Sequence, residues 1–237
     1  MQSVFLGRQP ILDAEERTYA YELLFRSSET NAYDPSVDGD RATAQVLVNA
    51  VVELGLDRIV GDRLAFINLT ERFISSPQLL ECLPPQRVVL EILEDVTATP
   101  RVLEGVRRLK EHGYTIALDD FVHHEDNDEL LDLADLIKYD ITQHDIEALR
   151  PQIARDRSCG RTALAERVET SEQFEALKAM GFEFFQGYHF ARPTVLQGAA
   201  LRSDRLGLAR LLSLVNDPDT GSKALVEAVS HDVSLSV

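Results

Sequence analysis

The feature that most limits how this chain can fold is a repeated alternation of short apolar runs with longer amphipathic ones. Continuously apolar runs are typical of parallel strands buried on both faces, and the amphipathic runs between them are typical of covering helices. The expected strands are 19–25, 64–69, 88–93, 115–121, 136–141, 162–168 and 182–190. Seven or eight strand–helix units in about 200 residues predict a modified TIM-type (β/α)8 barrel rather than an open sheet.

An eighth candidate strand, 6–12, contains Pro10 and is therefore expected at an edge or at the barrel rim. The clearest helical patterns are 42–54, 100–110 and 171–181. Pro100 opens the second of these and Gly113 follows its end, which is the usual asymmetry of helix termini. Ser171 is the expected N-cap of the third.

The character of the chain changes after Pro193, where no further strand pattern follows. Helical patterns at 204–215 and 222–230 flank an Asn-Asp-Pro turn. We therefore expect two domains. Residues 1–200 form the barrel, and residues 201–237 are the incomplete beginning of an all-helical domain.

Nearly every expected strand carries one or two polar side chains within its apolar run. These residues are Glu22, Asn68, Glu91, Asp119, Asp120, Lys138, Glu166 and Gln186. Apart from the first gap and the adjacent aspartates, successive members lie 18 to 28 positions apart, about one strand–helix unit. An uncompensated charge in a barrel wall costs on the order of several kcal/mol, so these groups need partners or a metal ion. Because the C-terminal ends of barrel strands converge on one mouth, we expect the residues to form one ring there.

A cluster so rich in oxygen favours hard divalent cations, Mg²⁺ or Mn²⁺. Consecutive strand residues point to opposite sides, so Asp119 and Asp120 both reach the mouth only where their strand ends and turns. One aspartate can then bridge two ions while the other binds the second, as in two-metal attack on a phosphodiester. Lys138 adds a cation that can orient water or stabilise charge on phosphate, although lysines among carboxylates are also common structural ion pairs.

The formal net charge of −16 argues against a broad attraction to nucleic acid polymers or to anionic membranes. An anionic substrate must therefore meet local cations or bound metal. No apolar run reaches the ~18 residues of a membrane span, and the N-terminal apolar stretch is too short for a signal peptide. Cys82 and Cys159 have no metal-type spacing and are expected to be buried thiols. The expected compartment is the cytoplasm.

At these polar residues the sequence resembles the EAL domain family of cyclic di-GMP phosphodiesterases. In YELLFR, Glu22, Leu23 and Leu24 stand for Glu-Ala-Leu, and Arg26 stands at the arginine that follows. The segments INLT, LEILE, LDDF, IKYD, AERVET and FFQGYHFARP follow in the family's order and spacing, over roughly residues 4–195. The resemblance implies a modified barrel that hydrolyses cyclic di-GMP to linear pGpG in bacterial signalling.

The resemblance also implies a role for each matched residue. The ligands of the first metal ion would be Glu22, Asn68, Glu91 and Asp119. Asp119, Asp120 and Glu166 would bind the second, and Glu166 would also act as a base. Lys138 would position the attacking water, and Gln186 would hydrogen-bond in the same shell.

Other matched residues would bind substrate or support the site. Arg26 would grip a phosphate group of cyclic di-GMP, while Leu24 and Gln9 would line the ligand groove. Glu94 and Glu169 would act as supports rather than as ligands. The 201–237 segment resembles the start of an HDOD domain, which implies a longer signalling protein with a partner for that tail, and a homodimer is expected.

Three departures from the family pattern keep alternatives open. Leu23 replaces alanine, and Arg167 replaces the glycine of the AEGVE motif. After Asp120 the chain reads FVHHEDNDEL, in which Val122 replaces a glycine and the following histidines and acids are expected to form a solvated loop. The alternative function is a catalytically inactive cyclic di-GMP receptor or protein-interaction scaffold. An unrelated barrel lyase with a lysine base is a third possibility.

Overall fold

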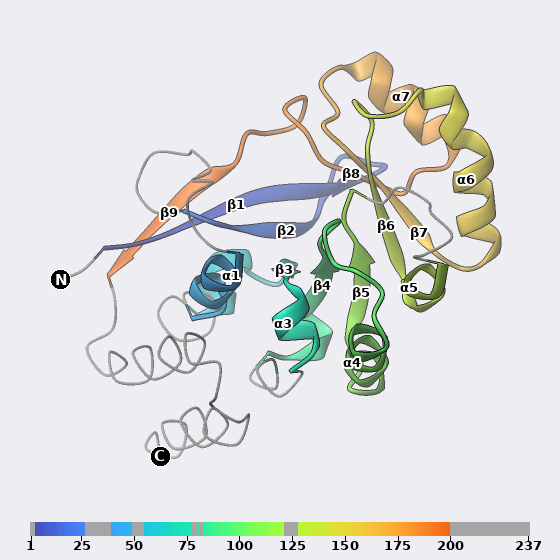
Figure 1. Ribbon diagram of the computed structural model, residues 1–237. Coiled ribbons are helices and arrows are strands. Elements are labelled where there is room, and N and C mark those ends of the chain that lie inside the picture. The colour runs from blue at the N-terminus through green and yellow to red at the C-terminus, as the bar shows by residue number, and fades with distance from the viewer. Residues whose placement is uncertain are drawn as a thin grey trace.

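The computed structural model describes residues 3–26, 39–48, 55–76, 80, 83–120 and 128–199. Eight of its strands close a ring, which confirms the expected barrel (Figure 1). They are β1 (Ser3–Asp13), β2 (Thr18–Phe25), β3 (Leu64–Leu69), β4 (Val88–Ile92), β5 (Thr115–Leu118), β6 (Leu136–Asp140), β7 (Thr162–Glu166) and β8 (Phe184–Phe185). Strands β2 to β8 are parallel neighbours in chain order, and β1 closes the ring between β8 and β2, antiparallel to both.

The helices lie in the connections between these strands and cover the outside of the ring (Figure 1). They are α1 (Gly39–Val48), α2 (Leu56–Val60), α3 (Glu71–Ile74), the 3-10 turn η3 (Pro85–Arg87), α4 (Pro100–Glu111), α5 (Asp128–Leu133), α6 (Ile146–Ser158) and α7 (Ser171–Met180). Helix α4 begins at Pro100 as expected. The N-cap of α7 is Thr170 rather than Ser171, because Thr170 forms a reciprocal capping box with Gln173.

Strand β1 differs from the marginal edge strand that Pro10 suggests, since it is the longest strand and has partners on both sides. Pro10 is tolerated because, on one edge of β1, it lies between the residues that pair with β9 and those that pair with β8. There β9 (Thr194–Ala199) pairs as far as Arg8, and β8 begins to pair only at Leu12. The missing N–H of proline therefore leaves no ladder bond unmade on that edge.

The interior of the barrel holds an apolar layer to which every ring strand contributes a side chain. These side chains are the buried Ile11, Ala20, Phe66, Val89, Ala117, Leu136 and Leu164, together with the partly buried Phe184. Side chains two positions apart share one face of a strand. The residue two positions further along each parallel strand therefore also faces the interior, one layer closer to the C-terminal ends of the strands.

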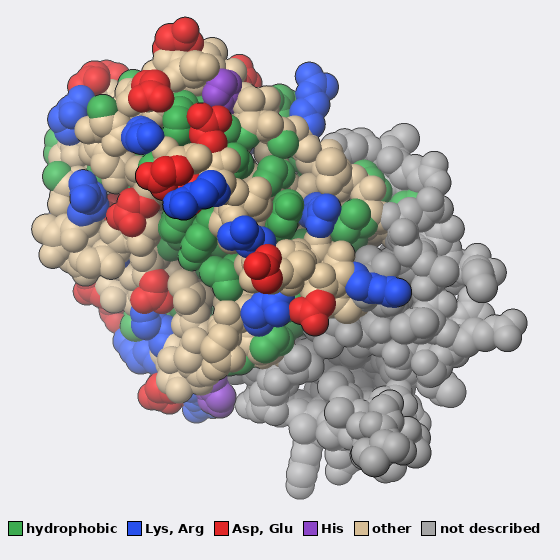
Figure 2. All heavy atoms as spheres, turned by 180° about the vertical axis from the view of Figure 1, so that it is seen from behind, with side chains coloured by type: hydrophobic (Ala, Val, Ile, Leu, Met, Phe, Trp, Pro, Cys, Tyr) green, Lys and Arg blue, Asp and Glu red, His purple; other side chains and the backbone are tan. Residues whose placement is uncertain are grey.

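The surface carries charge of both signs. Figure 2 shows acidic and basic side chains interspersed over the face it draws. Among the described residues, no helix has the length and apolarity needed to cross a membrane. Cys159, expected to be buried, is an exposed free thiol at the end of α6.

Several expectations fall outside the described residues. These are Cys82, the loop 121–127 with Val122 and its two histidines, and the helical segment 201–237 with the patterns at 204–215 and 222–230.

Candidate active site

Seven of the eight polar residues singled out in the sequence occupy the inward positions directly above the apolar layer, and Asp120 directly follows one of them, Asp119. Each of the seven lies two residues beyond the interior apolar residue of its own strand, as Glu22 follows Ala20 and Asn68 follows Phe66. The full set from the parallel strands or their ends is Glu22, Asn68, Glu91, Asp119, Lys138, Glu166 and Gln186. Strand β1 runs the other way, so its member, Gln9, lies two residues before Ile11 and pairs with Glu22.

Lys138, on β6, binds three carboxylates at the centre of the ring. Its Nζ lies 2.6 Å from Asp119 Oδ1, 3.0 Å from Glu91 Oε1 and 3.0 Å from Glu166 Oε1. Lys138 and Glu91 are fully buried, with exposed side-chain fractions of 1% and 0%. A buried lysine with carboxylates from three strands fixes their positions, because water does not screen the attraction.

Glu22, on β2, is held by two amide side chains. Gln186 Nε2 donates to Glu22 Oε2 at 2.7 Å, and Asn68 Nδ2 donates to Glu22 Oε1 at 3.2 Å. The glutamate thus connects β2 to β3 and to the end of β8. Both amide groups turn their nitrogen atoms toward the carboxylate, which leaves their oxygen atoms available for other ligands.

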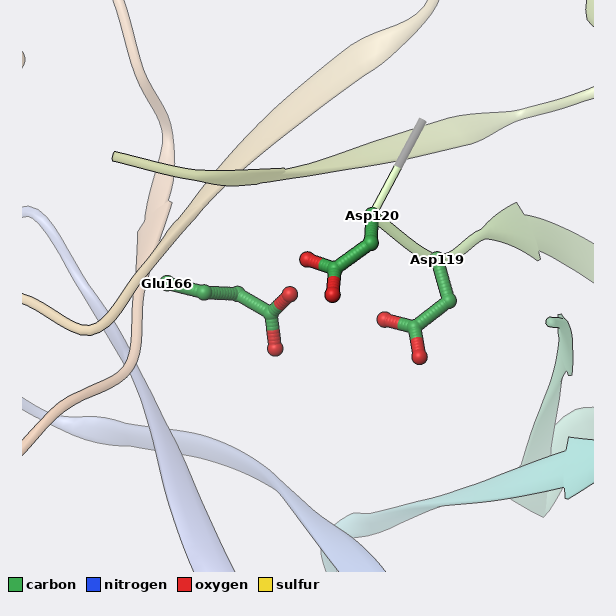
Figure 3. Close-up of side chains that lie close together, drawn as sticks. All are labelled: Asp119, Asp120 and Glu166. Atoms are coloured by element: carbon green, nitrogen blue, oxygen red, sulfur yellow. The ribbon is translucent and has the colours of Figure 1, made fainter. Parts of the chain in front are cut away.

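The adjacent aspartates both reach the mouth, as the sequence predicts. Asp119 and Asp120 follow β5, and Asp120 has a left-handed φ of 43°, so the strand ends and turns between them. Figure 3 shows the carboxylates of Asp119, Asp120 and Glu166 facing a common space. One oxygen atom from each lies within 4.8 Å of the others, a spacing at which one cation can bind all three.

Burial and crowding of negative charge shift several pKa values. Burial, reinforced by Asp119 and Glu22, raises the pKa of Glu166 to about 8 against the opposing attraction of Lys138. Burial likewise raises the pKa of Glu91 well above its ordinary value. Burial also raises the pKa of Asp120, with a further contribution from the charge of Asp119. The pKa of Lys138 is raised despite its burial, because four carboxylates stabilise its charge.

The donor set fits a hard divalent cation. Asn68 Oδ1, Glu91 Oε2 and Gln186 Oε1 are buried without a hydrogen-bond donor among the described residues. Buried oxygen atoms without donors are costly, and a cation satisfies them. All the candidate ligand atoms are oxygens, which suits Mg²⁺, Mn²⁺ or Ca²⁺ better than zinc.

The residues expected to bind substrate lie on the β1–β2 pair at the same end of the barrel. Leu24 is half-buried two positions beyond Glu22 and pairs with Gly7. Arg26 packs against Gly7. A methyl group added at Gly7 would lie 3.2 Å from both Arg26 Cγ and Arg26 Nε. The absence of a side chain at Gly7 therefore gives Arg26 its room. Gln9 lies deeper, opposite Glu22.

Glu94 and Glu169 are exposed and lie outside the ring. The charge of Glu94 contributes to the raised pKa of Asp120, after burial, Asp119 and Asp140. The backbone N–H of Glu169 donates to Gln173 Oε1 at 2.8 Å, at the start of α7. Neither side chain is positioned as a member of the central cluster.

Sequence reasoning assigned no role to Asp140, the last residue of β6. It is 1% exposed and accepts hydrogen bonds from Thr142 N, Thr142 Oγ1 and Gln143 Nε2, with Arg167 Nε 3.1 Å from its Oδ2. Burial alone would raise the pKa of Asp140, but these donors hold it below its ordinary value. Its position could have been predicted from the strand period, because Asp140 lies two residues beyond Lys138 and therefore on the same face of β6.

Comparisons with known proteins agree with this geometry. The model of the EAL domain family matches residues 4–193. YuxH of Bacillus subtilis is 34% identical over 239 residues, covering 98% of this chain and 58% of YuxH. The cyclic di-GMP phosphodiesterase CdgJ of Vibrio cholerae is 33% identical over 240 residues, covering 100% of this chain and 55% of CdgJ. The chain thus spans little more than half the length of these relatives.

The fold also matches solved structures. A manganese and cyclic di-GMP complex of Klebsiella pneumoniae BlrP1 at pH 9.0 superimposes with a TM-score of 0.67 at 21% identity, over 84% of this chain and 60% of BlrP1. A sequence match over most of the chain, the closed barrel with one antiparallel strand and the acidic ring at its mouth lead to one conclusion: this chain belongs to the EAL domain family.

Proposed function

We propose that this chain is a divalent-metal-dependent phosphodiesterase that hydrolyses cyclic di-GMP to linear pGpG. The observation that carries the proposal is the central cluster, in which carboxylates from β4, β7 and the end of β5 surround the buried Lys138. Membership of the EAL family supports it, as does the 33% identity to CdgJ, which is named a cyclic di-GMP phosphodiesterase.

Within this proposal the carboxylates form two metal sites. The first takes Glu22, Asn68, Glu91 and Asp119, and the second takes Asp119, Asp120 and Glu166. The support is the common space between the last three carboxylates and the buried oxygen atoms without donors on Asn68 and Glu91. Bound ions would activate a water molecule at neutral pH and neutralise charge on the phosphate.

Three polar side chains at the mouth each have a separate role in the proposed hydrolysis. The ammonium group of Lys138 orients the attacking water and offsets the negative charge that grows on the phosphate. Glu166, whose carboxylate faces the same space as those of Asp119 and Asp120, accepts a proton from that water as the general base. Gln186 keeps Glu22 in the orientation that metal binding requires.

We assign substrate contacts to the β1–β2 pair. Arg26 binds a phosphate group, for which the planar guanidinium fork is well suited. Leu24 provides an apolar contact beside it, and Gln9 provides an amide at the floor of the groove. We also assign Glu94 and Glu169 as supports: the charge of Glu94 acts on Asp120, and the backbone N–H of Glu169 accounts for one hydrogen bond at the start of α7.

The proposal extends to finer points. Oxygen-only donors favour Mg²⁺ or Mn²⁺ as the working ions.

Residues 201–237 begin an HDOD-like helical domain that binds a signalling partner. This assignment rests on the helical patterns at 204–215 and 222–230 and on their resemblance to the start of that domain. The similarity to YuxH covers 98% of the chain and so continues beyond residue 193, where the EAL match ends. The protein acts in the cytoplasm, as a homodimer.

The test is release of pGpG from cyclic di-GMP by the purified full-length protein with Mg²⁺ or Mn²⁺. Glu22→Ala and Lys138→Ala both stop turnover, while Lys138→Ala retains metal binding by calorimetry. Absence of turnover with both metals over a wide pH range would contradict the proposal. Nucleotide binding without turnover would instead identify a receptor.

A further inference from the structure

Arg167 is a cation fixed at the mouth of the barrel, directly after Glu166. Its Nε lies 3.1 Å from the buried Asp140 Oδ2. Hydrogen bonds from Thr142 and Gln143 already fix this carboxylate. Asp140 therefore has its acceptor sites filled by protein donors, in contrast to the oxygen atoms of the metal cluster. It serves as an anchor for the guanidinium group.

The anchored group remains open to ligands. The side chain of Arg167 is 62% exposed, and its Nε is the atom that contacts Asp140. Within the described part of the chain, Arg167 makes no ion pair with any other residue. A guanidinium group anchored through Nε on a largely exposed side chain can bind an anion through its terminal nitrogens.

The backbone at Arg167 is held in a conformation that arginine disfavours. Its φ is 58°, in the left-handed region, where a non-glycine residue costs on the order of 1 kcal/mol. The next residue is fixed from both sides, since Val168 N donates to Gln186 O and Val168 O accepts from His189 N, each at 3.0 Å. Gly187 permits this contact, because a methyl group there would lie 2.1 Å from Val168 O. Strained backbone conformations often occur at functional sites, so the strained Arg167 next to the acidic cluster suggests that its side chain has a function.

The charge of the mouth indicates what that function is. The mouth is strongly acidic, and its central cation, Lys138, is buried among carboxylates. A ligand with two phosphodiester groups needs cations that remain accessible. We propose that Arg167 is a further substrate-binding residue, which contacts a phosphodiester group of the ligand from the β7 side of the mouth. This inference rests on the proposed function and adds a contact to the same site.

The test measures affinity and stability in the same variants. Binding of cyclic di-GMP is measured by calorimetry with Ca²⁺ as the metal ion, after a check that no pGpG forms during the titration. The variants are Arg167→Gly, Arg167→Gln and Arg167→Lys in the full-length protein. Two controls lie away from the mouth. Glu16→Gly relieves a similar φ of 57°, and Arg108→Gln removes an ion-paired arginine of similar exposure.

The expected results separate binding from structure. Arg167→Gly and Arg167→Gln weaken affinity about tenfold or more, and Arg167→Lys weakens it less. Arg167→Gly is nevertheless more stable than Arg167→Gln, because both variants lose the ion pair to Asp140 but only glycine relieves the strain. Glu16→Gly relieves strain in the same way. Both controls keep wild-type affinity.

Two results would overturn the inference while leaving the proposed function intact. One is wild-type affinity in Arg167→Gly and Arg167→Gln. The other is an affinity that falls in proportion to the melting temperature across the three Arg167 variants, which indicates a structural role. No binding of cyclic di-GMP by the wild-type protein would overturn the proposed function together with the inference.

Discussion

Lys138 Nζ lies 2.6 Å from Asp119 Oδ1, at the end of a strand next to its own. This is the shortest of the three contacts that Lys138 makes with carboxylates, and all three are shielded from water. In the metal-free protein, Lys138 is therefore the positive charge that holds the acidic residues of β4, β5 and β7 together.

We predict that Lys138→Met lowers the free energy of unfolding of the metal-free protein by about 3–5 kcal/mol, because it leaves buried carboxylates facing one another. Divalent cations restore much of this stability, since they supply the missing positive charge. Thermal melts with and without Mg²⁺ measure the effect. Lys110→Met is the matched control, because Lys110 pairs with Asp135 at 2.7 Å on the outer surface. An equal loss in both variants would contradict the prediction.

The stability of the metal-free protein should fall as pH rises toward 8. The folded protein holds the Glu166 proton more tightly than the unfolded chain does, since its pKa is raised from 4.5 to about 8. The contribution to stability is therefore complete below 4.5 and is lost as pH rises through about 8. Saturating Mg²⁺ opposes this fall, because metal binding displaces the proton. Melting temperatures across this range test it, and Glu166→Gln should have a shallower slope.

Gly187→Ala should destabilise the mouth of the barrel. The added methyl group would lie 2.1 Å from Val168 O and 2.3 Å from Val168 N, so the segments that carry Gln186 and Arg167 must separate. We expect a loss of about 2 kcal/mol or more and weaker metal binding. Gly160→Ala is the control, because Gly160 also has a positive φ but has no atom within 4 Å of the added methyl. Equal effects in the two variants would argue against the close contact as the cause.

Asp140→Asn should weaken nucleotide binding through Arg167. An asparagine retains one acceptor oxygen and places an NH₂ group against existing donors, which costs about 1–3 kcal/mol of stability. Tyr139→Phe provides a control of comparable stability loss on the outer face of β6, where the Tyr139 hydroxyl donates to the buried Asp156 at 2.5 Å. Calorimetry should find reduced affinity for cyclic di-GMP only in Asp140→Asn. Equal affinities would contradict the role of Asp140 as an anchor.

Much of the barrel could be predicted because most of its strands are continuous runs of apolar residues. Strand β3 has the predicted bounds, 64–69, and β4 to β7 are shorter at their C-terminal ends. Helix α6 was missed because Pro151 lies inside it and many of its residues are charged. Strand β9 was missed because its pairing with β1 is a long-range contact that leaves little local pattern.

The candidate site was predictable for a reason that lies in the period of a strand. In each parallel strand the interior apolar residue precedes the polar one by two positions, as in Val89 and Glu91 or Leu136 and Lys138. The pairing of Asp140 with Arg167 could not be predicted in this way. It depends on the left-handed backbone at Arg167, which hydrogen bonds from a distant segment of the chain impose.

The reversed direction of β1 has a structural consequence. Its partner β9 runs from Arg8 toward Ser3, so the described chain enters and leaves by the same ribbon, on the side of the barrel where the parallel strands end (Figure 1). The same β1 is hydrogen-bonded along β2, which carries Glu22 and Leu24. Two hydrogen-bonded ladders, β9 to β1 and β1 to β2, therefore connect the chain at Ala199 to the strand that carries Glu22.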